Sequence, residues 1–142
     1  MIPKDAKIII GIDPGKHTGF AVWDKSEKKL LSVETLLIHQ AMKKVLNLHL
    51  EHGNSLFVRF EDANLRLWYA DKGRAQLQGA GSIKRDGVVW KDFLTDHKIN
   101  FEAVAPARGM TKYSDAKFKM ITGWKGRTNE HGRDAAILVI FQ

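Results

Sequence analysis

The chain has 142 residues, no cysteine and a formal net charge of +7 at neutral pH. This length suits one domain over residues 1–142 with a real hydrophobic core, and the lack of cysteine excludes disulfides and thiolate zinc sites. No apolar run approaches the ~20 residues that cross a bilayer, and the N-terminus lacks the layout of a signal peptide, so we expect a cytoplasmic protein with no membrane partner. The surplus of basic charge favours a polyanionic partner.

The first part of the chain predicts a β-hairpin over residues 7–13 and 18–24. The apolar run Ile8-Ile9-Ile10 leads to Asp13, the dipeptide Pro14-Gly15 supplies the turn, and a second apolar run returns. A carboxylate beside a buried strand is costly unless it is paired or bound to a metal, but Asp before Pro-Gly is also a common turn former. Both roles stay open for Asp13 from this stretch alone.

Hydrophobic periodicity in the rest of the chain predicts three more strands and four helices. The strands cover residues 30–35, 56–61 and 101–105, and the helices cover residues 38–52, 73–98, 114–122 and 129–142. The second helix is either continuous or broken, near Gly79-Ala80-Gly81 or at Asp86-Gly87. A three-stranded meander followed by βα units predicts an α/β fold, a five-stranded mixed sheet flanked by helices, and this layout is the ribonuclease-H-like architecture.

Three acids occupy similar places in these elements. Asp13 lies at the first strand and Glu61 ends the fourth, so the two can face each other if these strands are neighbours. Asp134 lies in the last helix, three residues after His131, which puts both on one helical face. Carboxylate oxygens are hard donors that suit Mg²⁺ or Mn²⁺, and a pair of such cations can activate water and stabilise a leaving 3′-oxygen. The pattern therefore indicates a two-metal phosphodiesterase.

Each of these residues also has a structural role open to it. Glu61 is then an ordinary acid at a strand end, and Asp62 beside it is a rival candidate from the opposite face. His131 and Asp134 are in that case two neighbouring side chains that interact on one helix, or they provide a charge near its N-terminus that interacts favourably with the helix dipole.

Two segments resemble motifs of the RuvC-type Holliday-junction resolvases. Gly11-Ile12-Asp13-Pro14-Gly15, with Thr18-Gly19-Phe20-Ala21, resembles the first motif of that family, and His131-Gly132-Arg133-Asp134-Ala135-Ala136 resembles the last. Glu61 resembles the second motif, and some family members carry Asp where this chain has His131. The resemblance implies a catalytic, metal-binding set with Mg²⁺, or Mn²⁺ as a substitute, made of Asp13, Glu61, His131 and Asp134.

The same resemblance implies a homodimer that makes paired nicks across a four-way DNA junction. Water activated on one metal would then attack the phosphorus in line and leave a 5′-phosphate and a 3′-hydroxyl. The chain is shorter than typical cellular members of the family. We therefore expect a compact phage or mobile-element form that acts in a bacterial or phage-infected cell.

Candidate DNA contacts lie in two segments. Basic residues accumulate ahead of the last helix, where they can bind phosphates, and the candidates are Lys112, Lys117, Lys119, Lys125 and Arg127. Directly after Glu61 follow the basic candidate Arg66 and two aromatic candidates, Trp68 and Tyr69, which can stack on bases or wedge open a crossover. A solvated helix face for each lysine and a core position for Trp68 are the alternatives. Small residues over 75–81 suit a helix contact at a dimer interface.

Three other function classes stay open. An actin-type or Hsp70-type ATPase also has Ile-Gly-Ile-Asp-x-Gly at its first strand, but that fold needs two such domains and gives His131 no role. A nuclease of the same fold that cuts RNA, flaps or forks would use the same chemistry. A non-catalytic module that binds nucleic acid would not need the four candidate ligands. We expect a Mg²⁺-dependent, structure-selective endonuclease, in the first place a resolvase of four-way junctions.

Overall fold

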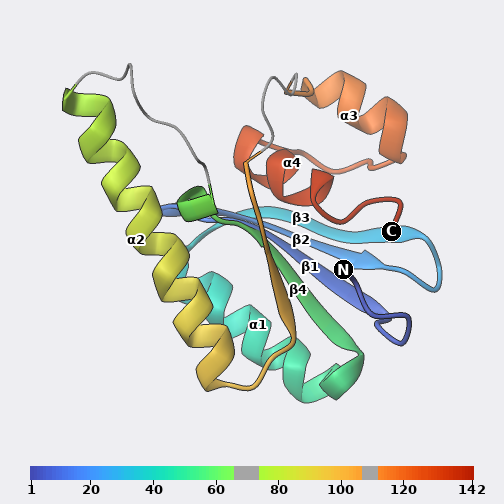
Figure 1. Cartoon of the computed structure of the whole chain (residues 1–142). Helices are drawn as coiled ribbons and strands as arrows, with labels where there is room; N and C mark the ends of the chain where they lie inside the picture. Colours follow the sequence, from blue (N-terminus) through green and yellow to red (C-terminus); the bar gives the residue numbers. More distant parts are fainter. Residues whose placement is uncertain (66–73, 107–111) are drawn as a thin grey trace.

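The computed structural model describes residues 1–65, 74–106 and 112–142, with the backbone alone over residues 74–80. Its centre is a five-stranded sheet in the order β3-β2-β1-β4-β5 (Figure 1). The strands are β1 (Ile8–Asp13), β2 (His17–Asp24), β3 (Lys29–Leu37), β4 (Leu56–Glu61) and β5 (Phe101–Val104). The flanking helices are α1 (Ile38–His52), α2 (Arg74–Asp96), α3 (Asp115–Thr122) and α4 (Glu130–Ile137). The predicted α/β fold with a mixed five-stranded sheet is confirmed.

Strand β1 is the middle strand of the sheet, between β2 and β4. It runs antiparallel to β2, with Asp13 opposite Gly19, and parallel to β4, with Ile12 opposite Phe60. Successive side chains of a strand point to opposite faces, and here both faces are covered. This explains the unbroken apolar run at the start of the chain, since Ile8, Ile9 and Ile10 are all buried.

Helices α1 and α2 cover one face of the sheet, and α3 and α4 lie on the other (Figure 1). On the first face, Ile10 packs in one core with Val45 of α1 and Trp90 of α2. On the second face, Ile9 packs in another core with Ala136 of α4. The sheet is therefore the shared wall of two hydrophobic cores.

Helix α4 lies with its backbone directly against β1 and β2. A Cβ atom added at Gly11 would overlap the carbonyl oxygen of Ala135, and one added at Gly19 would overlap the carbonyl oxygen of His131. Both positions therefore need glycine because of close approach. The contact sets the first turn of α4 beside the end of β1, where Asp13 lies.

The second predicted helix is continuous, so neither of its predicted breaks occurs. Helix α2 runs through Gly79, Gly81 and Gly87 without interruption. At Gly87 an added Cβ would lie 2.5 Å from Oδ1 of Asp62, so this glycine admits a close contact with the loop after β4. Within the described ranges, no helix has both the length and the apolar character that crossing a membrane requires.

The last helix is shorter than predicted, because α4 ends at Ile137 and tight turns follow. The amides of Val139 and Ile140 both donate to the carbonyl of Ala136, which turns these two buried side chains onto the sheet. Arg59 of β4 donates from Nη1 to the carbonyl of Leu138 at 3.0 Å. The prediction of a helix to residue 142 is wrong because packing and this hydrogen bond stabilise a turn instead.

We expect Gly11→Ala to lower the free energy of unfolding by about 1–3 kcal/mol, because the added methyl group must push α4 away from β1. Urea denaturation measures this change. Gly15→Ala in the turn between β1 and β2 is the matched control, because the nearest atom to its added Cβ, the carbonyl oxygen of His17, lies at an ordinary contact distance of 3.5 Å. A less flexible unfolded chain should make that control neutral or stabilising by up to about 1 kcal/mol. Equal midpoints for Gly11→Ala and the unaltered protein would contradict the close approach of α4.

Candidate active site

Two candidate acids end neighbouring parallel strands. Because Ile12 pairs with Phe60, Asp13 and Glu61 are the next residues on β1 and β4. Because side chains alternate between the two faces of a sheet, Glu61 points to the same face as Arg59, and Arg59 contacts the turn after α4. By the same alternation along β1, Asp13 points to the face on which α4 packs against Gly11. Both acids thus belong to one edge of the sheet and to its α4 face.

The last helix brings His131 to Asp13. Nδ1 of His131 lies 3.2 Å from Oδ2 of Asp13, across 118 residues of sequence. The start of α4 is set by Asn129, whose side chain accepts a hydrogen bond from the amide of Gly132 at 3.0 Å. Asn129 also bonds to the hydroxyl of Thr35 on β3, so the helix start is tied to the sheet.

One turn further along α4, Asp134 contacts a lysine rather than the other candidate ligands. Nζ of Lys112 lies 3.1 Å from Oδ2 of Asp134 and also contacts Glu130, the first residue of α4. Hydrogen bonds to Glu130 and Asp134 raise the pKa of Lys112, so its ammonium group is charged. Glu130 is a participant that the sequence patterns did not single out; its only signal was its position one residue before His131.

The electrostatics of Asp13 reflect this crowding of acids. Burial raises the pKa of Asp13 above its ordinary value, and the charge of Asp134 adds to the rise. The hydrogen bond and charge of His131, and the charge of Lys112, act in the opposite direction. An ionised Asp13 is therefore held in an environment that a bound cation would relieve.

The donors fit a divalent cation in kind, since they are carboxylate oxygens and one imidazole. The candidate ligands for Mg²⁺ are Asp13, Glu61, His131 and Asp134. Asp13 and His131 are in contact, whereas Asp134 is engaged by Lys112. Among the described residues, no three Asp, Glu, His or Cys side chains are gathered as a group that could hold a metal ion.

The geometry separates Glu61 from its rival Asp62. Oδ1 of Asp62 accepts hydrogen bonds from the backbone amide of Asn64 at 2.9 Å and from its side-chain amide at 2.8 Å. Asn64 in turn donates to the carbonyl of Lys84 in α2. Asp62 is buried and joins the loop after β4 to α2, on the face away from α4. This role is structural.

The candidate DNA-binding cations differ in their surroundings. Lys119 pairs with Asp115 one turn earlier in α3, at 2.9 Å, and Nζ of Lys117 lies 5.1 Å from the centre of the Tyr113 ring. Lys125 and Arg127 are exposed in the loop between α3 and α4. Arg66, Trp68 and Tyr69 lie outside the described residues, as do the side chains of residues 75–80.

A hydrogen-bond network that the sequence did not indicate ties α3 to α4. Arg133 donates from Nε to the carbonyl of Tyr113 and from Nη1 to the hydroxyl of Thr128, both at 2.9 Å. Thr128 in turn donates to Asp115. The hydrogen bonds from Thr128 and Lys119 lower the pKa of Asp115. The network holds the segment that carries Lys112 and Lys117 beside the candidate ligands.

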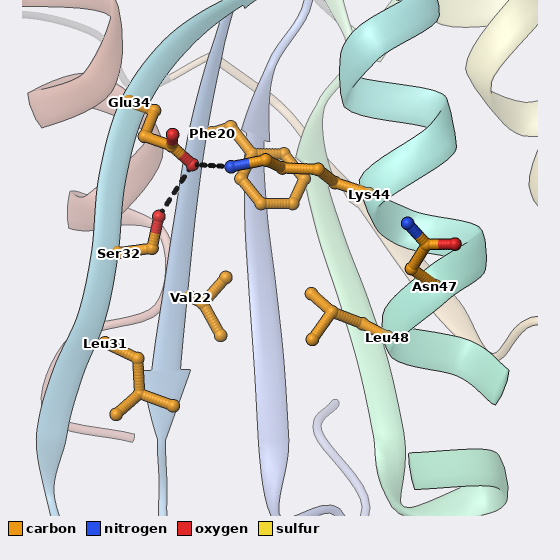
Figure 2. Close-up of a pocket in the computed structure, with 8 residues that line it drawn as sticks. All are labelled: Phe20, Val22, Leu31, Ser32, Glu34, Lys44, Asn47 and Leu48. Atoms are coloured by element: carbon orange, nitrogen blue, oxygen red, sulfur yellow. Dashed lines mark hydrogen bonds and ion pairs between the residues drawn. The ribbon is translucent and has the colours of Figure 1, made fainter. Parts of the chain in front are cut away.

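An apolar pocket of about 320 Å³ lies on the other face of the sheet, between α1 and the strands β2 and β3 (Figure 2). Its floor includes Phe20 and Val22, and the ion pair of Glu34 with Lys44 borders it. None of the candidate acids or basic residues lines this pocket. The candidate ligands thus lie at the strand ends and not at this pocket.

No protein-family model and no curated protein sequence matches this chain. Among solved structures, the fold is similar to that of the RuvC protein of T. thermophilus in complex with a Holliday junction substrate, with a TM-score of 0.58 and 16% sequence identity. The similarity covers 92% of this chain and 89% of that chain. A likeness at this identity concerns the fold, and it confirms the predicted ribonuclease-H-like architecture.

In the protein without metal, we expect Asp13→Asn to raise the free energy of unfolding at neutral pH. A pKa raised by folding means that ionisation of Asp13 lowers stability as the pH rises from the ordinary pKa of Asp through the folded-state pKa. The gain from Asn is then present at neutral pH and vanishes when the pH falls below the ordinary pKa of Asp. Urea denaturation with EDTA, at acidic and neutral pH, measures the difference.

The matched control is Asp24→Asn at the opposite end of the hairpin, since Asn retains the oxygen that accepts from the amide of Glu27. This control should change stability by no more than about 0.5 kcal/mol. A loss of stability in Asp13→Asn at neutral pH would contradict the raised pKa.

We expect Asp62→Ala to lower the free energy of unfolding by about 1–3 kcal/mol, because the two hydrogen bonds from Asn64 to the buried carboxyl group of Asp62 are lost. Chemical denaturation measures this change, and Asp92→Ala on the exposed face of α2 serves as the control. If both variants are as stable as the unaltered protein, Asp62 has no such structural role.

Proposed function

We propose that residues 1–142 form one nuclease domain, a Mg²⁺-dependent endonuclease that hydrolyses phosphodiesters of branched DNA, with four-way junctions as its preferred substrate. The observation that carries the proposal is the contact between Asp13 and His131, which joins the first strand to the last helix at the strand ends. Asp134 lies one turn further along that helix, and Glu61 ends the neighbouring strand.

The fold and the charge agree with this proposal. The T. thermophilus RuvC protein, whose fold is similar, was solved in complex with a Holliday junction substrate. The net charge of +7 and the exposed basic residues between α3 and α4 suit a polyanion. The RuvC-like motifs of the sequence lie in the elements that meet at this edge.

When bound, Mg²⁺, or Mn²⁺ in its place, would supply an activated water and stabilise the leaving 3′-oxygen. Asp13, Glu61, His131 and Asp134 would hold the cations. Strand β1 fixes Asp13, because both of its neighbours in the sheet hold it in register. His131 faces Asp13 through Nδ1, so Nε2 is the ring atom that would bind a cation or transfer a proton.

The remaining parts of the proposal concern DNA and assembly. Phosphates would be bound by Lys112, Lys117, Lys119, Lys125 and Arg127, and an unstacked base by Arg66, Trp68 or Tyr69. Paired nicks across a junction need two active sites, so we propose a homodimer, with the small residues over 75–81 at its interface. A compact enzyme of this kind would act in the cytoplasm of a bacterial or phage-infected cell. A nuclease for flaps, forks or RNA is the second candidate, since it would use the same ligands.

The test is cleavage of a synthetic four-way junction, a flap, a fork and a linear duplex with Mg²⁺. We expect symmetric nicks in the junction, and a loss of about 100-fold or more in Asp13→Asn, because a metal ligand contributes several kcal/mol to the transition state. Asp24→Asn should cleave at the normal rate. Equal cutting of flaps and forks would favour the second candidate, and undiminished cutting by Asp13→Asn would refute the proposed site.

A further inference from the structure

We propose that Lys112 is a built-in competitor for the cation at this site. In the free protein its ammonium group pairs with Asp134 and Glu130. When DNA binds, the ammonium group leaves these acids and pairs with a DNA phosphate. DNA binding therefore raises the affinity of the site for a divalent cation. This inference rests on the proposed function and concerns its regulation.

The contacts of Lys112 reach across the site. Its Nζ atom lies 3.1 Å from Oδ2 of Asp134 and also contacts Oε1 of Glu130. Glu130 and Asp134 are four residues apart on α4 and therefore share one face of the helix. One ammonium group thus contacts two acids, and offsets one of their two negative charges, at the position where Asp134 would bind a cation.

An oxygen engaged by an ammonium group must lose that partner before it can coordinate a metal ion. Lys112 and a divalent cation therefore compete for Asp134, and each lowers the apparent affinity of Asp134 for the other. Exposed ion pairs are weak, because water and salt screen them and the long side chain loses freedom when it is held. The side chain of Lys112 is 61% exposed, whereas that of Asp134 is 19% exposed, so the lysine is the partner that can move away.

DNA offers Lys112 an alternative partner. An ammonium group is a flexible point charge that binds phosphate oxygens as readily as carboxylates. Lys112 belongs to the basic segment, and the network of Arg133 with Tyr113 and Thr128 holds that segment beside α4. A phosphate that approaches Asp13 and Asp134 therefore passes within reach of Lys112.

Lys117 and Lys119 differ from Lys112 in the direction of their contacts. Lys119 pairs with Asp115 of its own helix, and Lys117 lies over the ring of Tyr113. These contacts stay within α3 and the residues just before it, whereas Lys112 contacts α4. Lys117 is therefore a matched control for the loss of one positive charge from the same segment.

The coupling must be reciprocal. If DNA raises the affinity for the cation by some factor, the cation raises the affinity for DNA by the same factor. Metal ions would then load mainly onto protein that already holds DNA.

The first measurement is Mn²⁺ binding to the full chain without DNA, followed by the electron paramagnetic resonance signal of free Mn²⁺. We expect Lys112→Met to bind Mn²⁺ roughly three- to tenfold more tightly than the unaltered protein, as the loss of two weak ion pairs implies. Lys112→Arg keeps the competing charge and should bind like the unaltered protein, as should Lys117→Met.

The second measurement is the affinity for a labelled four-way junction, by fluorescence anisotropy, with and without Ca²⁺ at constant ionic strength. We expect Ca²⁺ to strengthen junction binding by the unaltered protein and by Lys112→Arg, and to do so several-fold less for Lys112→Met. Equal Mn²⁺ affinities in all variants, with junction cleavage by the unaltered protein intact, would overturn the competition and leave the proposed function standing. If no variant binds Mn²⁺ and the unaltered protein does not cleave, both ideas fail together.

Discussion

The close approach of α4 to β1 and β2 is the constraint on which the rest of the structure depends. The backbone carbonyls of Ala135 and His131 lie where a side chain at Gly11 or Gly19 would have to be. The two ends of the helix are then held separately, by the Asn129 cap at its start and by Arg59 on the turn that follows. Only with the helix seated this deeply can His131 reach the carboxylate of Asp13.

This packing gathers negative charge at one edge of a basic protein. Burial raises the pKa of Asp13, and the charge of Asp134 adds to the rise. Such a site lowers stability unless a cation or a basic side chain offsets it. Here Lys112 and His131 supply part of the compensation, and the two hydrophobic cores on either side of the sheet hold the strands that carry the acids.

The sequence predicted those features that depend on local pattern. Alternating and continuous apolar runs indicated the strands, and the spacing of His131 and Asp134 put both on one helix. The sequence alone could not predict features that depend on tertiary contacts. The choice between Glu61 and Asp62 needed the register of β4 and the hydrogen bonds of Asn64. The sequence does not reveal which distant segments come into contact. It therefore could not predict the contact of Lys112 with α4, the network of Arg133 or the early end of α4.

The separation of 118 residues between Asp13 and His131 has a consequence for synthesis on the ribosome. The hairpin that carries Asp13 precedes the other elements in the chain, whereas α4, which covers Gly11 and Gly19, follows all five strands. Contacts between such distant segments form late, because the chain between them must first be ordered. A nascent chain that stops before α4 therefore has all five strands but lacks two of the four candidate ligands. We expect the contact between Asp13 and His131 to form only after α4 has been translated.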